Sequence, residues 1–432
     1  MLRQVYILSV TLLKFVVKLI KKMKKKQAYF GLPEEVKFCK KCVISNQRPS
    51  STIEFKNEKG EKKKVINFND DGICSACVYN EEKEKRISWE DREEKLKKLL
   101  SQFRSTDGSY DVIVPGSGGK DSAFTAHVLK YKYGMNPLTV TWSPHLYTDI
   151  GWKNMQEWMH TGGLDNILYT PNGILHKEMT KNAFHNLLHP FQPFIVGQRI
   201  IGPAMAKKFG VKLVMYGENQ AEYGNAIEEN TNPIMNMDFF SSDDEMNMKF
   251  GGVSMKEYIE TGKYSKDDFA PYIAPEKKDL IKAGVEVHYL GYYLRWDPQE
   301  CYYYSVENTG FQANPVRTEG TYSKYSSIDD KIDPFHYFTT LIKFGIGRCT
   351  YDAAQEVRND KITREEAAYL VKKYDTEFPE IYFQEFLNYI DSSEDEFWET
   401  VNKHRSPHIW KEVNGEWKLR HNVSLTGTDD KN

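Results

Sequence analysis

Three glycines and four polar side chains follow one another in Gly116-Ser-Gly-Gly-Lys-Asp-Ser122. Glycine lets a phosphate approach backbone N–H groups closely, because it has no Cβ. Lys120 can add a positive charge, and Ser117 and Ser122 can add hydroxyl donors. The segment therefore predicts an anion-binding loop, called the glycine loop below (residues 116–122).

The elements around the glycine loop should direct it at a ligand. An apolar run at 111–114 predicts a buried strand, and 123–133 has helical character. A strand, a glycine-rich turn and a helix together point backbone N–H groups and a helix N-terminus at an anion. The alternative is a turn that only connects the strand to the helix.

The same alternation continues along the chain and predicts an α/β fold, a parallel sheet covered by helices on both faces. Ligands of such sheets bind beyond the carboxyl ends of the strands. This places residues 142–148, residues 170–173 and Gly217-Glu218-Asn219 at the same edge as the glycine loop. The further strands are expected at 136–142, 165–170, 211–216 and 285–290, and the helices at 151–161, 174–188, 199–209, 255–261 and 275–283.

Two Cys-x-x-Cys pairs precede the sheet and are separated by 31 residues. Four thiolates suit a tetrahedral zinc ion with no open ligand position, which would stabilise a small module without catalysing. Redox-active pairs and unrelated buried cysteines are the alternatives. The predicted ligands are Cys39, Cys42, Cys74 and Cys77.

Length and charge limit the function classes. The 432 residues suffice for two or three domains, and a net charge of −2 argues against a general nucleic-acid binder. Six cysteines indicate a reducing cytoplasm rather than a disulfide framework. We predict a linker helix in 81–108, a main domain over 109–290 with a loosely ordered insertion at 239–252, a tyrosine-rich helical region over 291–423 and a disordered tail at 424–432.

Residues 1–30 contain eight basic and no acidic side chains. The basic residues of 1–26 follow a helical stripe beside an apolar run, which favours an amphipathic helix on a membrane surface or on a partner. The alternatives are a helix docked on the body of the protein and an upstream translation start whose extra residues add little. We expect a cytoplasmic protein with this contact at the inner face of the membrane.

The region after residue 291 mixes polar and aromatic residues, and such a mixture is typical of the lining of a site, because unpaired buried polar groups are costly. A tyrosine-rich packing layer is the alternative. Thr363 and Glu366 predict a capped helix.

The spacing of the glycine loop differs from that of a Walker A loop. It resembles the Ser-Gly-Gly-x-Asp-Ser signature of the ATP pyrophosphatases, or PP-loop enzymes. Together with the cysteine pairs and the runs Gly320-Thr-Tyr-Ser-Lys-Tyr325, Ser327-Ile-Asp-Asp330 and Lys343-Phe-Gly-Ile-Gly-Arg348, residues 37–415 resemble the N-acetyl sugar amidotransferases of surface-polysaccharide and flagellin-glycan synthesis. Residues 1–36 lie outside this resemblance.

The resemblance implies a reaction and the groups that perform it. ATP would adenylylate the acetamido carbonyl of a nucleotide-linked sugar acid or a nonulosonic acid, and ammonia would then give an acetamidino group, with release of AMP and pyrophosphate. Separate glutaminase and cyclase-like proteins would supply the ammonia. Lys120, Asp121 and Ser122 would be catalytic, Asp121 could help hold Mg²⁺, and the nucleotide would bind Ser117, Gly118, Gly119, Lys120, Asp121, Ser122, Gly217, Glu218 and Asn219. Lys324, Lys343 and Arg348 are candidates for binding the carboxylate of the sugar or the nucleotide phosphate, and Tyr325 is a further candidate substrate residue.

PP-loop enzymes that thiolate tRNA are the alternative class. Such enzymes need a reactive cysteine, and Cys301 and Cys349 are the candidates outside the two pairs. The near-neutral net charge argues against tRNA. A scaffold with an inactive nucleotide site is a third interpretation, which the presence of Lys120, Asp121 and Ser122 disfavours.

Overall fold

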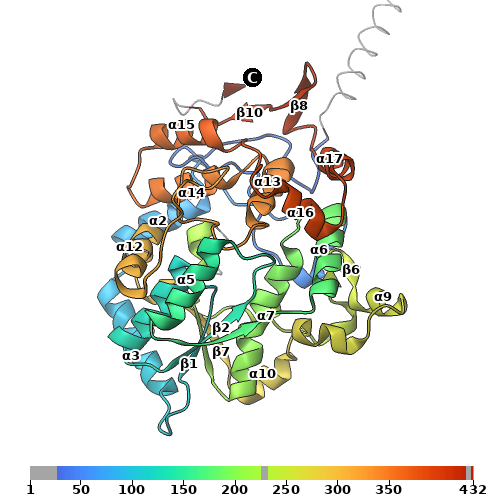
Figure 1. Ribbon diagram of the computed structural model, residues 1–432. Helices are drawn as coiled ribbons and strands as arrows, with labels where there is room; N and C mark the ends of the chain where they lie inside the picture. Colours follow the sequence, from blue (N-terminus) through green and yellow to red (C-terminus); the bar gives the residue numbers. More distant parts are fainter. Residues whose placement is uncertain (1–26, 225–231, 425–429, 432) are drawn as a thin grey trace, which may run out of the picture.

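A computed structural model describes residues 27–224, 232–424 and 430–431 (Figure 1). The predicted basic helix at 1–26 and most of the predicted tail lie outside the described residues. Among the described residues, no helix is long and apolar enough to cross a membrane.

The main domain is built on one sheet of five parallel strands in the order β3-β2-β1-β4-β7. This confirms the predicted α/β fold. The central strands β1 and β2 are buried along their whole length, as expected of a sheet covered on both faces. Their bounds are β1 (Val112–Pro115), β2 (Pro137–Trp142), β3 (Asp165–Tyr169), β4 (Leu213–Tyr216) and β7 (Glu286–Tyr289).

Alternate residues of each strand pack against different helices. Ile113 and Val214 face the cluster that contains α7 (Gln192–Phe209), whereas Val112 and Leu213 face the cluster of α3 (Trp89–Phe103), α4 and α5. Helices α5 and α7, both labelled in Figure 1, therefore belong to opposite faces of the sheet. The helices of this domain are α4 (Lys120–His127), the π-helical turn η2 (Val128–Lys132), α5 (Asp149–His160), α6 (Gly173–Leu187), α7, the 3-10 helix η3 (Gln220–Tyr223), α10 (Lys277–Ala283) and α11 (Leu290–Tyr293).

The segment before the sheet contains two helices rather than the predicted single linker helix. The second cysteine pair opens α2 (Ser75–Lys85), and α3 (Trp89–Phe103) starts afresh, because Ser88 caps it by accepting a hydrogen bond from the Asp91 amide. The rest of the cysteine module is loop with one 3-10 helix, η1 (Glu54–Lys56).

The predicted loose insertion at 239–252 is wrong, because its aromatic residues are core. Phe240 and Phe250 are both 1% exposed and belong to the same hydrophobic cluster as α7. Short elements therefore fold onto the sheet domain here: η4 (Met237–Phe239), η5 (Glu245–Asn247), β5 (Lys249–Phe250), β6 (Val253–Ser254), α9 (Met255–Glu260) and η6 (Lys266–Tyr272).

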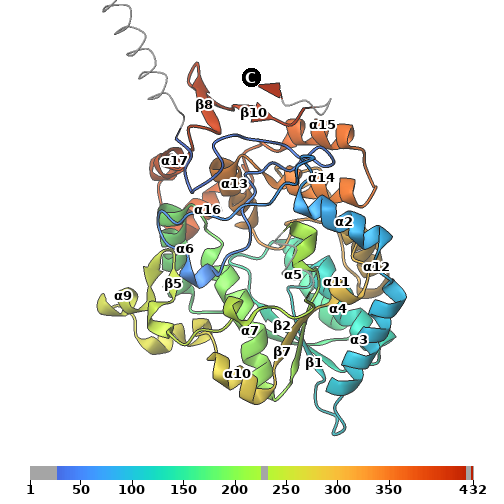
Figure 2. The ribbon, with the colours of Figure 1, turned by 180° about the vertical axis from the view of Figure 1, so that it is seen from behind.

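The C-terminal region is helical, as predicted, and the cysteine module lies along it (Figure 2). Cys39 and Cys74 share a hydrophobic cluster with Ala353 and Ala367 of this region. The predicted cap at Thr363 is confirmed, because Thr363 and Glu366 form a reciprocal capping box. The elements are α12 (Pro298–Thr309), α13 (Asp333–Phe344), α14 (Arg348–Arg358), α15 (Arg364–Tyr374), α16 (Phe383–Ile390), α17 (Glu394–Lys403), β8 (Trp410–Val413), β9 (Glu416–Leu419), β10 (His421–Asn422) and β11 (Asp430–Lys431).

Candidate active site

The glycine loop connects the carboxyl end of β1 to the N-terminus of α4. Gly118 has φ of +81°, and a Cβ there would lie 2.9 Å from the Met155 Cα. The turn therefore requires glycine at this position for two reasons, the backbone conformation and the lack of space. Gly119 caps α4 without a side-chain hydrogen bond. The first N–H groups of the helix therefore have no side-chain acceptor at the cap and can bind an anion.

The polar side chains of the glycine loop are held by short contacts. The Ser122 hydroxyl donates to the Gly119 carbonyl over 3.0 Å. The Lys120 ammonium pairs with the Asp121 carboxylate. Burial would lower the pKa of Lys120, but the Asp121 carboxylate outweighs burial and raises it. Lys120 is therefore charged at neutral pH.

Strand order brings a second carboxylate to this loop. The chain leaves β1 toward β2 and β3 and then crosses to β4 on the other side of β1, so the crossing point of the sheet lies between β1 and β4. Glu218 follows β4 there. Burial, and next the charge of Asp121, raise the pKa of Glu218. Tyr223 donates a hydrogen bond of 3.1 Å to Glu218 Oε1.

The pair of Asp121 and Glu218 fits a divalent cation. Asp121 Oδ1 is buried and has no hydrogen-bond partner in the described part of the chain. Two carboxylates that repel one another, one with a free oxygen, are a favourable donor set for Mg²⁺ beside phosphate.

The other two residues predicted after β4 have packing roles. A Cβ at Gly217 would lie 2.8 Å from the Trp296 ring, so this position allows close contact with the segment before α12. Asn219 Oδ1 accepts a hydrogen bond of 3.3 Å from the Ala221 amide and opens η3. Both residues shape the backbone that presents Glu218.

Three cavities meet at Asp121. One of about 250 Å³ lies beyond the ends of β1, β4 and β7 and includes the glycine loop and Arg199. A second, of about 180 Å³, lies on the α5 side of the loop and includes Asp329. The largest of these three, of about 440 Å³, extends from Lys120 into the C-terminal region and the cysteine module. It is called the largest cavity of the site below, because a separate cavity of about 610 Å³ lies along α13 and β8. A ligand bound at the loop therefore adjoins a pocket that three parts of the chain form together.

Two of the four predicted substrate residues line these cavities. Arg348 faces both the largest and the smallest cavity, pairs with Asp352 at 3.1 Å and lies 4.4 Å from the Tyr337 ring. Tyr325 lines the same two cavities, and its hydroxyl donates to Glu356 Oε1 over 3.3 Å.

The other two predicted substrate residues lie elsewhere. Lys324 is exposed, and its ammonium donates to the Pro315 carbonyl over 3.0 Å. Lys343 is 7% exposed and donates to the Leu187 carbonyl over 3.0 Å, beside the Phe30 ring. Burial lowers the pKa of Lys343 to about 7. Neither residue lines the three cavities at the glycine loop.

Several site residues were not among those predicted from the sequence. Asp329 lies in the quoted run 327–330, and burial raises its pKa against a hydrogen bond from Ser117. Arg48 from the cysteine module and Arg358 from α14 line the largest cavity, although 310 positions of chain separate them. Only the tertiary fold brings these residues to Lys120.

The four predicted ligand cysteines form one buried cluster. Their Sγ atoms all lie within 4.8 Å of one another, with Cys39 to Cys77 at 3.9 Å and Cys42 to Cys74 at 3.7 Å. A tetrahedral ion with Zn–S bonds of about 2.3 Å places its sulfurs about 3.8 Å apart. The cluster therefore fits a single tetrahedral ion.

Cys301 and Cys349, the candidates for sulfur transfer, are 2% and 0% exposed. Burial raises the pKa of both thiols. A thiol with a raised pKa is a poor nucleophile, so neither position has the character of a sulfur donor.

Comparison with known proteins gives one family match. The family described as "LPS biosynthesis protein WbpG-like, C-terminal domain" matches residues 319–423. An uncharacterized protein of Methanocaldococcus jannaschii is 34% identical over 82 residues, which cover 18% of this chain and 27% of that protein. The chain thus spans about a quarter of the length of this curated relative.

Solved structures with partial similarity have low TM-scores, so the fold assignment rests on the sheet itself. An NH₃-dependent NAD synthetase from Campylobacter jejuni is 17% identical with a TM-score of 0.26, covering 32% of this chain and 59% of its own. The NMN synthetase from Francisella tularensis is 12% identical with a TM-score of 0.28, at 72% and 96% coverage. The U34-tRNA thiolase NcsA from Methanococcus maripaludis is 12% identical with a TM-score of 0.29, at 73% and 88% coverage.

Proposed function

We propose that this chain, whose residues 319–423 match the WbpG-like C-terminal domain of LPS biosynthesis proteins, is an ATP-dependent amidotransferase of surface-polysaccharide synthesis. Its acceptor is the acetamido group of an N-acetyl sugar. One observation carries the proposal: the glycine-loop cavities and the cavity of the C-terminal region meet at Asp121, and Lys120 lines two of the three. A nucleotide phosphate and a sugar can therefore meet at these two side chains.

The nucleotide site is the cavity beyond β1, β4 and β7. The N–H groups of the glycine loop and the start of α4 bind the phosphates, and Lys120 compensates their charge. Asp121 and Glu218 are the residues that would hold Mg²⁺, which supplies charge neutralisation for the phosphates. The four-cysteine cluster holds zinc as a structural ion.

The acceptor chemistry requires activation, because resonance makes an amide carbonyl a poor electrophile. Transfer of the adenylyl group to the acetamido oxygen releases pyrophosphate and converts this oxygen into a leaving group. Ammonia then forms the new C–N bond, and the C–O bond breaks, so that AMP leaves with the former carbonyl oxygen. The protein contributes by positioning the carbonyl against the α-phosphate and by stabilising the negative charge that develops.

The ammonia comes from separate glutaminase and cyclase-like partners in the cytoplasm. Both cysteines outside the metal cluster are buried, as is expected of packing residues rather than glutaminase nucleophiles. The sugar acceptor is a nucleotide-linked sugar acid or a nonulosonic acid, and no nucleic acid takes part. The basic segment 1–26 brings the enzyme to the inner face of the membrane.

The test supplies ATP, Mg²⁺, ammonium and a panel of acetamido sugars to the purified chain. We expect AMP, pyrophosphate and a sugar product one mass unit lighter, because NH replaces O. A variant with Cys301→Ser and Cys349→Ser should keep this activity. Pyrophosphate release that depends on tRNA, or its loss in the double cysteine variant, would contradict the proposal and favour thiolation.

A further inference from the structure

The proposed amidotransferase reaction brings three reactants to one carbon atom: ATP, the acetamido sugar and ammonia. The nucleotide is assigned to the cavity beyond β1, β4 and β7, and the sugar to the largest cavity of the site. The third cavity, of about 180 Å³ on the α5 side of the glycine loop, has no assigned ligand. It adjoins the other two at Asp121, so a small molecule in it lies next to both the phosphates and the sugar.

Two cations and two carboxylates line this third cavity. Both cations have a carboxylate partner, because Lys120 pairs with Asp121 and Arg348 pairs with Asp352 at 3.1 Å. Asp329 forms no ion pair with any described residue, and Ser117 of the glycine loop donates a hydrogen bond to it. The Asp329 carboxylate can therefore accept a proton from a ligand in the cavity.

The backbone on both sides of Asp329 is fixed to the edge of the sheet. The Thr148 hydroxyl donates to the Ile328 carbonyl, and the Thr148 amide donates to the Asp329 carbonyl over 3.2 Å. The neighbouring Asp330 has a structural role, since its Oδ2 lies 2.7 Å from both the amide and Nδ1 of His145. Of these two adjacent aspartates, only Asp329 lines the cavity.

Two further features maintain the position of Asp329. A Cβ at Gly151 would overlap the Asp329 backbone, so the start of α5 can approach it only because this residue is glycine. Ser327 has φ of +56°, a left-handed conformation that is uncommon for serine. Such conformations persist where the surrounding structure enforces them, and they are concentrated at functional sites.

The surroundings of Asp329 favour its action as a base. Burial raises the pKa of Asp329, against the hydrogen bond from Ser117, and Asp330 raises it further whereas Arg348 lowers it. A carboxylate with a raised pKa is a stronger base than a solvated one. Asp333 of α13 is the neighbouring rival, because burial raises its pKa to about 7, but it lines none of the three cavities. The titratable groups around Asp329 are those of Lys120, Asp121, Tyr147, Asp330, Asp333 and Arg348.

We propose that the third cavity is the ammonia site and that the Asp329 carboxylate takes a proton from the attacking nitrogen. The lone pair of ammonia forms the C–N bond at the adenylylated carbon, and the nitrogen becomes positively charged. Asp329 accepts one proton of this nitrogen. The electron pair of that N–H bond then forms the C=N bond while the C–O bond breaks and AMP leaves with the oxygen. This inference rests on the proposed function and deepens it, because it assigns a site to the nucleophile and a further catalytic residue.

The test separates adenylylation from the attack of ammonia in the full-length, metal-loaded chain. With ATP, Mg²⁺ and the accepted acetamido sugar but no ammonium, rapid quenching measures the pyrophosphate of the first turnover. With ammonium added, AMP formation gives kcat/KM for ammonium. We expect Asp329→Asn to keep first-turnover pyrophosphate close to the wild-type value and to lower kcat/KM for ammonium about 100-fold or more.

Hydroxylamine in place of ammonium gives a second readout. After attack its nitrogen loses a proton far more readily than that of ammonia, so its reaction depends less on a base. The loss in Asp329→Asn should therefore be about 10-fold smaller with hydroxylamine than with ammonium. A residue that only maintains the structure would lower both rates by the same factor.

Three variants serve as comparisons. Asp391→Asn, at an exposed residue after α16 that pairs with Lys181 at 3.3 Å, should behave like the wild type. Asp333→Asn should leave the ratio of the rates with the two nucleophiles unchanged. Metal content and circular dichroism report the fold of each variant, and Asp329→Ser replaces Asp329→Asn if the latter does not fold.

A wild-type kcat/KM for ammonium in Asp329→Asn overturns the ammonia site and leaves the proposed function in place. An equal loss with both nucleophiles also overturns it, as does a selective loss in Asp333→Asn instead. Loss of first-turnover pyrophosphate in Asp329→Asn would place this residue at the nucleotide and overturn its role as the base. A wild-type chain that forms no AMP with any acetamido sugar contradicts the proposed function and, with it, the ammonia site.

Discussion

Lys120 brings a positive charge to the edge of the sheet where the phosphates are expected. Replacing it with alanine should reduce pyrophosphate release about 100-fold or more, because a group that stabilises charge in the transition state is lost. Metal content should stay at the wild-type value, since the cysteine cluster has its own ligands. The measurement is enzymatic detection of pyrophosphate with ammonium supplied directly.

Lys97→Ala is the matched control, because Lys97 is an exposed lysine of α3 that forms an ion pair with Glu94, far from the glycine loop in the sequence. It should keep full activity. Wild-type pyrophosphate release in Lys120→Ala would mean that the glycine loop is not the catalytic centre.

The stability of the protein should depend on pH through Lys343, because burial lowers the pKa of its ammonium group to about 7 in the folded state. In the unfolded chain the value is about 10.4. Between these values the unfolded state binds more protons, so stability rises with pH across this window, by at most about 1.4 kcal/mol per unit. Below pH 7 both states are protonated and the destabilisation is constant.

Lys343→Met should therefore flatten the dependence of unfolding free energy on pH between 7 and 10. At neutral pH the variant should also be more stable, because it buries no charge at this position. The loss of the hydrogen bond to the Leu187 carbonyl offsets this gain in stability by about 1 kcal/mol. Urea unfolding at pH 6.5 and 9 measures the effect. An unchanged pH slope in the variant would show that the Lys343 ammonium does not titrate in this window.

Lys343 and Arg348 also show what residue types alone can predict. Both are basic, five positions apart, in one quoted run. Arg348 at the start of α14 faces the cavities, whereas Lys343 near the end of α13 is directed into the contact with α6. The sequence identifies a cation but does not determine the side of the helix on which the site will lie.

At the scale of elements, local patterns predicted most of the architecture. The strands of the sheet and the capping box of α15 follow from periodicity and from side-chain chemistry within a few residues. The segment 239–252 was predicted wrongly because Phe240 and Phe250 are buried by long-range packing. A pattern of isolated aromatics among polar residues carries no information about such contacts.

Binding of the sugar should depend on the cysteine module, because the module forms one wall of the largest of the three cavities at the glycine loop. Ile44, Arg48 and Ile66 line that cavity, and the module has few elements of regular structure of its own. Cys74→Ser should therefore weaken binding of the acetamido sugar as well as lower the metal content. Metal analysis, proteolysis within 43–73 and calorimetry measure the three effects.

The exposed Ser51→Ala is the control and should change none of them. If Cys74→Ser loses the metal but binds the sugar with wild-type affinity, the module is a separate unit and the cavity does not depend on it.

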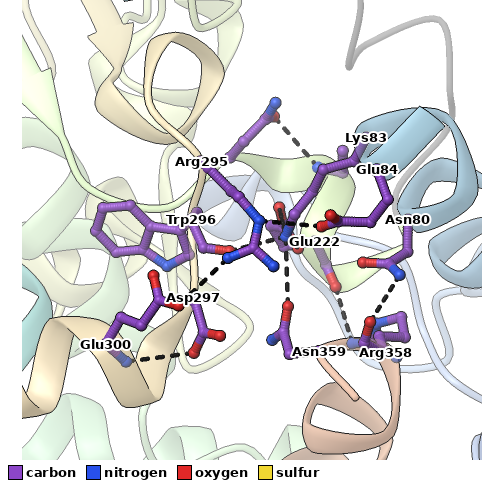
Figure 3. A network of polar contacts seen from close by, with 12 residues as sticks. Asn80, Lys83, Glu84, Glu222, Arg295, Trp296, Asp297, Glu300, Arg358 and Asn359 are labelled. Carbon is purple, nitrogen blue, oxygen red and sulfur yellow. Dashed lines mark hydrogen bonds and ion pairs between the residues drawn. The ribbon is translucent and has the colours of Figure 1, made fainter. Parts of the chain in front are cut away.

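At the scale of the whole molecule, one buried ion pair connects the three parts that form the cavity. Lys83 of α2 is 0% exposed and pairs with Glu222 of η3 at 3.0 Å. It also donates to the Trp296 carbonyl at 2.8 Å and lies 3.5 Å from Asn359 Oδ1 (Figure 3). Its sequence context is a run of alternating charges, which is typical of a solvated helix face, so only the fold identifies it as core.

This pair predicts a non-additive response to mutation. Lys83→Met should destabilise the protein by about 3–5 kcal/mol, because the carboxylate of Glu222 stays buried without its partner. The double variant Lys83→Met with Glu222→Gln should recover much of that loss, since no charge is left unpaired. Denaturant unfolding of the two variants measures the difference.

Lys97→Met, which breaks the exposed pair with Glu94, should change the unfolding free energy by at most about 1 kcal/mol. The Lys83 variants also report on the cavity. Lys83 contacts Trp296 and Asn359, and these two residues border the segments that carry Asp297 and Arg358. If the ion pair fixes these segments, the double variant regains stability but binds the sugar more weakly than the wild type. Full recovery of both properties would mean that hydrophobic packing alone sets the three parts in place and that the ion pair adds nothing to the position of the cavity wall.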